Sequence, residues 1–281
     1  MRLGFAIALA SLLLPRLAAA ACSGADCFAG GGPASTDCIV TWSGITGPST
    51  TCVDGSACDQ DGVADGVCTL PLSACLGDSS CGVTGGVTSA KVTPARMEGA
   101  AALQGAIQGL APDQCTTPGF TVPVKLSAQL GPIKPGVDKM RAVVSAGGKK
   151  DSDVIKITCQ PPSPSFAADI QPILTQRCTQ GVCHGAGVPA ESLNLSAGAA
   201  YGSLVGAKSI EGGKLKIVTP GSISKSFMAR KILGRGLSGN GSNGAMMPQG
   251  CPSLPLSPGG CLTDAEKYLI LSWIQAGAQN N

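Results

Sequence analysis

The chain has 281 residues, of which 43% are hydrophobic and 13% charged, a composition typical of a globular protein with one large domain or two modest ones. Its formal net charge of +3 provides no basis for nucleic-acid binding, so we expect no nucleic-acid partner. Beyond the N-terminus no apolar run is long enough to cross a bilayer.

The first 20 residues have the features of a signal peptide. Arg2 supplies a positive charge, residues 3–14 form an apolar core, and three alanines at 18–20 suit a cleavage site. We therefore expect a periplasmic or secreted protein with no transmembrane segment after cleavage. Lipidation of Cys22 is a less favoured alternative, because it would leave an odd number of cysteines, one of them unpaired, in an oxidising compartment.

A proline-rich stretch at 160–165 is typical of an interdomain linker. It divides a cysteine-rich segment, 21–159, from a second segment, 166–281. The first has ten of the 14 cysteines at irregular spacing, which favours disulfides of undetermined connectivity. We expect an α+β, mostly β domain there, with strands near 120–126 and 154–159. We also expect one helix with Pro94 in its first turn and Met97 on its apolar face.

An acidic loop in this first segment is a weak candidate for calcium binding. Asp59, Asp61 and Asp65 alternate with other residues around a glycine, which suits a hard cation. The twelve-residue calcium-loop pattern is incomplete, and an ordinary Asp-Gly turn is the favoured interpretation.

The second segment has helical periodicity interrupted by glycine-rich loops, so we expect an all-α domain. One helix starts at Phe166 and ends near Arg177. Another has Ser224 as its cap and stops at Gly234. The last begins with a capping box formed by Thr263 and Glu266 and ends near Gly277.

Two cysteines and the only histidine of the chain lie together at 178–184. Cys178 and Cys183 are separated by four residues, and His184 follows directly. Covalent haem c attachment needs two thiols for the vinyl groups and an adjacent imidazole for the iron, usually as C-x-x-C-H. The longer spacing here also allows a disulfide with a surface histidine. A zinc site is a further alternative, but adjacent Cys and His would strain tetrahedral ligation.

Methionine is the natural second axial ligand if His184 takes the first, because the chain has no other histidine. Met228 falls on the apolar face of a helix, where a core role is favoured. Met246 and Met247 lie in a polar, glycine-rich loop, and both remain candidates. We expect Cys251 and Cys261 to form a disulfide that stiffens this loop.

The second segment resembles the c-type cytochrome domain of exported bacterial proteins over about 166–278. The resemblance rests on the haem motif and on the order of several short stretches: 166–174, 193–195, 220–221, 226–227, 246–248, 262–266 and 273–278. It implies a cytochrome c-like all-α fold with one covalent haem c, and it assigns the second axial position to Met247.

These features lead to the expectation of an exported mono-haem cytochrome that carries one electron and is not itself an enzyme. Nine Lys or Arg against five Asp or Glu in 166–281 suit an acidic redox partner, although a solvated surface fits equally well. An alternative is an extracellular binding or scaffold protein whose cysteine-rich domain binds calcium or an adhesive partner. A peroxidase or gas sensor is disfavoured, because no second histidine could serve distal acid–base chemistry.

Overall fold

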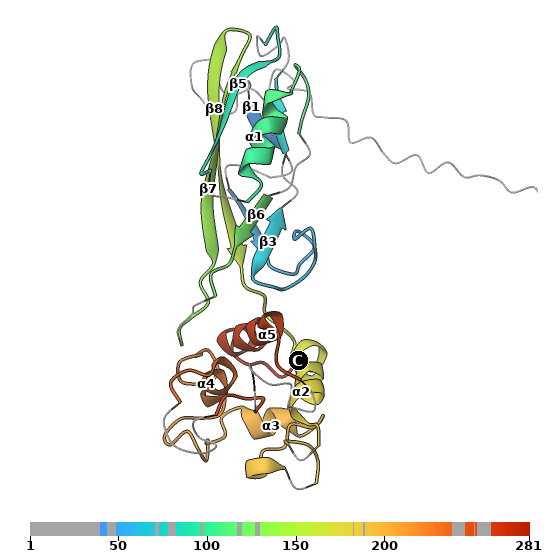
Figure 1. Ribbon diagram of the computed structural model, residues 1–281, viewed down its shortest axis with the longest axis vertical. Coiled ribbons are helices and arrows are strands. Elements are labelled where there is room, and N and C mark those ends of the chain that lie inside the picture. Colours follow the sequence, from blue (N-terminus) through green and yellow to red (C-terminus); the bar gives the residue numbers. More distant parts are fainter. Residues whose placement is uncertain are drawn as a thin grey trace, which may run out of the picture.

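The computed structural model describes the chain from Val40 onward with several gaps: 40–43, 49–70, 73–77, 83–95, 98–116, 120–126, 130–181, 183–187, 189–237, 245–249, 251 and 260–281. The expected signal peptide, Cys22 and Met97 lie outside these residues. Strands occupy the N-terminal half and short helices the C-terminal half of an elongated molecule (Figure 1).

Eight strands make up three sheets in the N-terminal half: β1 (Val40–Ser43), β2 (Ser49–Val53), β3 (Val67–Leu70), β4 (Ser73–Leu76), β5 (Val87–Thr93), β6 (Phe120–Pro123), β7 (Gly136–Ala146) and β8 (Lys149–Gln160). The main sheet has the order β2-β8-β7-β5, with β2 parallel to β8 and the other pairs antiparallel. Two-stranded sheets join β1 with β4 and β3 with β6.

The long hairpin of β7 and β8 forms because its residues alternate between two faces. Met140, Val144, Ile155 and Ile157 are fully buried on one face, whereas the residues between them are exposed or half-buried. The connecting pair 147–148 is Gly-Gly with φ of 57° and 76°, the left-handed conformation that a tight hairpin turn requires. Helix α1 (Ala100–Gln108) packs beside β5.

Among the cysteines of this half that the structure describes, three disulfides connect Cys52 with Cys58, Cys68 with Cys159, and Cys75 with Cys115. The bond between Cys68 and Cys159 joins β3 to the end of β8 across a sequence separation of 91 residues. The loop-entropy relation gives a contribution of about 4.5 kcal/mol for a loop of that length. The prediction of a disulfide-bonded chain is confirmed.

The C-terminal half contains a π-helical turn, η3, a 3-10 turn, η4, and four α-helices. Their bounds are η3 (Phe166–Ile170), α2 (Gln171–Cys178), η4 (Ala190–Ser192), α3 (Ala200–Leu204), α4 (Phe227–Leu233) and α5 (Asp264–Gln275). Phe166, Tyr201 and Trp273 form an aromatic cluster at the centre, with ring centroids 5.2 to 6.5 Å apart. Backbone amides and a hydroxyl of residues 165–167 bind Asn281, so the end of the described chain closes onto the start of this half.

The expectation of an all-α C-terminal half is wrong. The described part of the protein is mixed α/β, with a four-stranded sheet and five short α-helices. Between α3 and α4 the chain forms bridges, such as that between Val205 and Val218, in place of a helix. The physical reason lies in residues 214–218, where exposed lysines alternate with the half-buried Leu215 and Ile217. A period of two favours extended chain.

Two helix starts also differ from expectation. Pro94 follows the end of β5 and lies outside the helix, because α1 begins only at Ala100, after Gly99 in the left-handed conformation. The N-cap of α4 is Ser226 and not Ser224, although the helix ends at Gly234 as expected.

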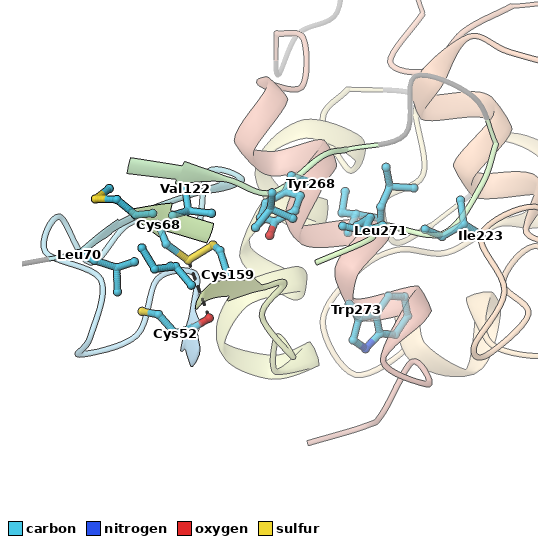
Figure 2. Packing of buried hydrophobic residues seen from close by; sticks show 14 of the residues in the cluster. Cys52, Cys68, Leu70, Val122, Cys159, Ile223, Tyr268, Leu271 and Trp273 are labelled. Atoms are coloured by element: carbon cyan, nitrogen blue, oxygen red, sulfur yellow. Dashed lines mark hydrogen bonds between the residues drawn. A yellow bond between two sulfur atoms is a disulfide. The ribbon is translucent and has the colours of Figure 1, made fainter. Parts of the chain in front are cut away.

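The two halves meet along one side of α5. The side-chain amide of Gln275 donates to the carbonyl oxygen of Ile133 at 2.9 Å and accepts from its amide at 2.6 Å. Tyr268, two turns earlier on the helix, reaches towards Val122 of β6 and the nearby Cys68–Cys159 disulfide (Figure 2). Of the expected linker, 160–165, Gln160 is the last residue of β8, and residues 161–165 have no regular structure before η3.

No helix in the described residues combines the length and the hydrophobicity that crossing a membrane demands.

Candidate functional site

The segment 178–184 begins at the last residue of α2. Pro172 starts this helix, and the buried Ile173 and Leu174 hold it against the core. After the helix the chain turns back, because the amide of His184 donates to the carbonyl oxygen of Cys178 at 2.9 Å. The histidine therefore lies beside the end of α2.

Cys178 and Cys183 differ from the other cysteines that the structure describes. Eight of those form four disulfides, whereas these two are half-buried free thiols. Burial raises the pKa of the Cys178 thiol to about 12, and the neighbouring Cys183 and Glu266 add to this effect. The Cys178 thiol therefore keeps its proton at neutral pH.

His184 is oriented by a backbone carbonyl group. Its Nδ1 lies 3.1 Å from the carbonyl oxygen of Ala190. Because a carbonyl oxygen only accepts hydrogen bonds, Nδ1 carries the ring proton and Nε2 keeps its lone pair. The amide of Leu195 binds the histidine carbonyl oxygen at 2.7 Å, and the amide of Ala190 binds that of Cys183 at 2.8 Å. These contacts hold the ring in an orientation that leaves Nε2 available to a metal.

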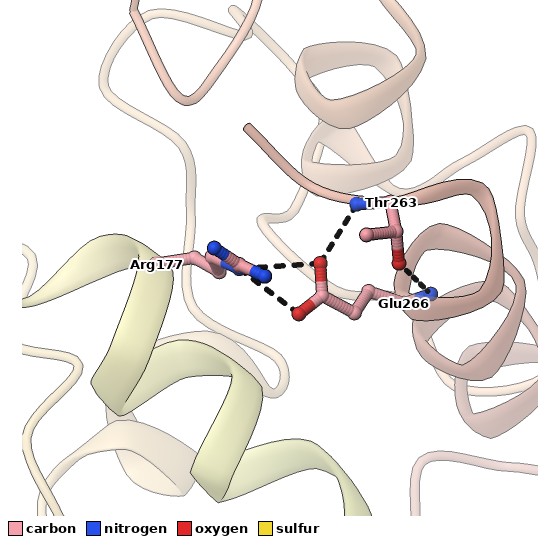
Figure 3. Close-up of polar contacts among 3 residues, drawn as sticks. All are labelled: Arg177, Thr263 and Glu266. Carbon is pink, nitrogen blue, oxygen red and sulfur yellow. Dashed lines mark hydrogen bonds and ion pairs between the residues drawn. The ribbon is translucent and has the colours of Figure 1, made fainter. Parts of the chain in front are cut away.

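An ion pair fastens the end of α2 to the start of α5 (Figure 3). Arg177, next to Cys178, places its Nε 2.9 and 3.2 Å from the two carboxylate oxygens of Glu266. The same carboxylate accepts the amide of Thr263 at 2.7 Å, and the threonine hydroxyl accepts the amide of Glu266 at 3.1 Å. The expected capping box is thus present, and it also supports the helix that carries the first thiol.

The methionine segment is attached to α4. The amide of Met247 donates to the carbonyl oxygen of Lys231 at 2.9 Å. The sulfur of Met246 packs against Gly234, only 2.9 Å from where a Cβ on that glycine would stand. Met247 is half-buried, as Met246 is, and Met228 is buried on α4. Met246 therefore has a packing role that explains its position, whereas no such role is evident for Met247.

A buried ion pair holds this segment from a second direction. The ammonium group of Lys231 contacts the carboxylate of Glu211 at 2.6 Å and donates to the carbonyl oxygen of Ala245 at 3.3 Å. On the other side of the segment a disulfide joins Cys251 to Cys261, the pair expected from the sequence.

The three candidate calcium ligands serve the backbone of their own loop. The buried Asp59 accepts the amides of Gly55 and Thr69 at 3.0 and 2.8 Å. Asp61 and Asp65 each accept the amide two residues ahead, as turn-forming aspartates do. The described residues contain no group of three or more His, Cys, Asp or Glu side chains that could hold a metal ion. The structure does not bring these three aspartates together as a calcium site.

Sequence reasoning missed a buried acid at the junction between the halves. Asp54 is 1% exposed, faces Tyr268 of α5, and accepts the amide of Gly66 at 2.8 Å. Burial raises its pKa to about 6, and the nearby Asp65 and Asp59 contribute. Its sequence context, Asp-Gly after a strand, indicates only a turn.

Comparisons with protein family models, curated proteins and solved structures found no match to this chain.

Proposed function

We propose that this chain is an exported mono-haem c-type cytochrome that carries or relays one electron between partner proteins. The proposal rests on two free thiols and one imidazole that lie close together between residues 178 and 184. Among the described cysteines only Cys178 and Cys183 form no disulfide, and His184 beside them keeps Nε2 free. This donor set has the chemistry that haem c requires.

The side chains of residues 178–184 suit a covalently bound haem, and each would have a defined role. Cys178 and Cys183 would form the two thioether links, and His184 Nε2 would ligate the iron. The carbonyl oxygen of Ala190 would orient the imidazole and increase its basicity through Nδ1–H. When bound, the haem supplies a one-electron redox centre.

Met247 is the proposed ligand on the other side of the iron. Its backbone is fixed to α4, while the sulfur of Met246 already packs against Gly234. A thioether ligand would raise the reduction potential. If His184 and Met247 both held the iron, they would leave no site for a substrate on the metal, which favours an electron carrier over an enzyme.

Export is supported by the features expected of the N-terminal segment and by the four described disulfides, because such bonds persist in oxidising compartments. The proposed partner is another redox protein with an acidic surface. The excess of basic residues in 166–281 would steer such a partner.

The proposal is tested by producing the chain with its N-terminal segment in a host that matures c-type cytochromes. We expect one haem per chain by intact mass and a sharpened α-band after reduction with dithionite. Cys178→Ala/Cys183→Ala would remove both covalent links, so acid acetone would extract any haem that the variant still binds, whereas the wild type would keep its haem. A colourless product with the mass of the bare polypeptide would refute the proposal.

The distal assignment is tested separately with Met247→Ala and, as a matched control from the same loop, Met246→Ala. We expect Met247→Ala to lower the reduction potential and to let added imidazole bind to the iron. Met246→Ala would keep both properties near the wild-type values. Equal spectra and potentials for Met247→Ala and the wild type would contradict the assignment.

A further inference from the structure

Charge is unevenly distributed in the N-terminal half. Residues 21–159 contain twelve Asp or Glu and nine Lys or Arg, so this half is acidic as a whole. The outward face of the main sheet nevertheless has five basic side chains and no acidic one among the positions of β2, β8, β7 and β5: Lys91, Lys139, Arg141, Lys150 and Lys156. We call these five residues the basic sheet face.

The strand register arranges the five basic side chains along one strip of the sheet. Lys139 of β7 lies directly opposite Lys156 of β8. Two residues further along β7, Arg141 lies opposite Val154 of β8. Lys91 of the neighbouring strand β5 lies opposite Val143, which pairs with Ser152 on the other side. All five basic residues are exposed.

The acids of the same two strands lie on the opposite face. Asp138, Asp151 and Asp153 pair with Ile157, Val144 and Ala142, all of them buried positions. In the part of the chain that the structure describes, no ion pair involves any residue of the basic sheet face. The positive charges of this face therefore have no ion-pair partner among the described residues. This arrangement has a cost, because like charges directly opposite each other destabilise a sheet.

The shape of this surface is an elongated flat strip. Lys139 and Ser145 are six residues apart on β7, and Ser145 lies opposite Lys150 of β8. At the usual rise of a strand this separation is about 20 Å. Hydroxyl side chains accompany the charges: Ser152 lies between Val154 and Lys150 on the outward side of β8, and Ser145 lies opposite Lys150. The large apolar residues of the face are valines, and it has no aromatic side chain to insert into a bilayer.

We propose that the basic sheet face binds a linear anionic polysaccharide along the direction of β7 and β8. Carboxylates of the glycan would pair with the ammonium and guanidinium groups, and its hydroxyls would bond to the serines that accompany them. A flat strip of alternating charges and hydroxyls suits an extended polyhydroxylated chain, whereas a membrane surface would need larger apolar anchors. The protein would thus be held at an anionic matrix by one half while the other half remains accessible.

The experiment uses the full-length protein and polygalacturonate, a carboxylated glycan, with neutral dextran as the uncharged glycan control. Binding is measured by biolayer interferometry at several salt concentrations. The test variant is Lys139→Gln/Arg141→Gln/Lys156→Gln. The matched control is Lys208→Gln/Lys214→Gln/Lys216→Gln, which removes three exposed positive charges from the other half.

We expect the wild type to bind polygalacturonate, to ignore dextran, and to bind more weakly as salt rises. The test variant would bind about 100-fold more weakly, as expected for three lost charge contacts of roughly fivefold each. The control variant would bind like the wild type, and circular dichroism would show that both variants are folded. Equal losses in both triple variants, or binding to phosphatidylglycerol vesicles without binding to polygalacturonate, would overturn the proposal.

Discussion

Replacing Asp54 with asparagine is expected to stabilise the protein above pH 6 and to change its stability little at pH 4. Asp54 is buried at the junction of the two halves, and one of its carboxylate oxygens accepts the amide of Gly66. The carboxyl group also faces the hydroxyl of Tyr268, which lies next to the hydroxyl of Ser272. An asparagine keeps an acceptor for Gly66 and brings a donor towards these hydroxyl oxygens.

The direction follows from the pKa of the carboxyl group, which rises from an ordinary value of 3.8 to about 6 in the folded protein. Between these two values the folded protein binds a proton that the unfolded chain has released. The free energy of unfolding therefore falls as the pH rises from 4 to 6, and the full cost of the buried charge remains above pH 6. At roughly 1.4 kcal/mol per pH unit the upper bound is about 3 kcal/mol. We expect a gain of about 1–2 kcal/mol, because the asparagine amide must also be desolvated.

The assay is urea unfolding of the wild type and Asp54→Asn at pH 4 to 8, followed by circular dichroism. Asp61→Asn is the matched control, because Asp61 is an exposed aspartate of the same region. The reasoning is refuted if the difference in unfolding free energy between Asp54→Asn and the wild type is the same at pH 4 and pH 8, or if the variant is less stable at pH 8.

Three further predictions concern stability. Replacing both Cys68 and Cys159 with alanine should lower the free energy of unfolding by about 4 kcal/mol, because a loop closed over 91 residues is released; a loss below 1 kcal/mol in urea unfolding would contradict this. Glu266→Gln keeps the helix cap but removes the charge that pairs with the arginine of α2, so thermal unfolding should show a loss of about 1–2 kcal/mol that shrinks in high salt. Lys156→Glu converts a like-charge pair with Lys139 into an opposite-charge pair and should stabilise the sheet by about 0.5–1 kcal/mol; a lower melting temperature would show that the register argument fails.

Features that depend on neighbouring residues were predictable from the sequence. The capping box of α5 needs only Thr263 and a glutamate three residues later, and it is present in the structure. The end of α4 at Gly234 follows from a glycine in the left-handed conformation. The motif at 178–184 could be identified because its three side chains are within seven residues of one another.

Local patterns were also the source of the errors. The all-α expectation for the C-terminal half counted the segment between its helices as glycine-rich loops, but this segment contains bridges such as those between Val205 and Val218 and between Lys208 and Lys216. The apolar residues near Pro94 suggested a helix start, but β5 continues to Thr93 because its pairing with β7 adds hydrogen bonds that a single segment cannot reveal.

The sequence alone determined the presence of a Cys-Cys-His group, the cysteine-rich half and the caps of individual helices, because these depend on residues close together in the chain. The tertiary structure alone decided how the described cysteines of the N-terminal half pair, how Arg177 reaches Glu266 across 89 residues, and why Asp54 is buried beside Tyr268. It also brought five basic side chains from three strands onto one face. These contacts join segments far apart in the chain, and their positions follow from the packing of the whole core, which no local pattern encodes.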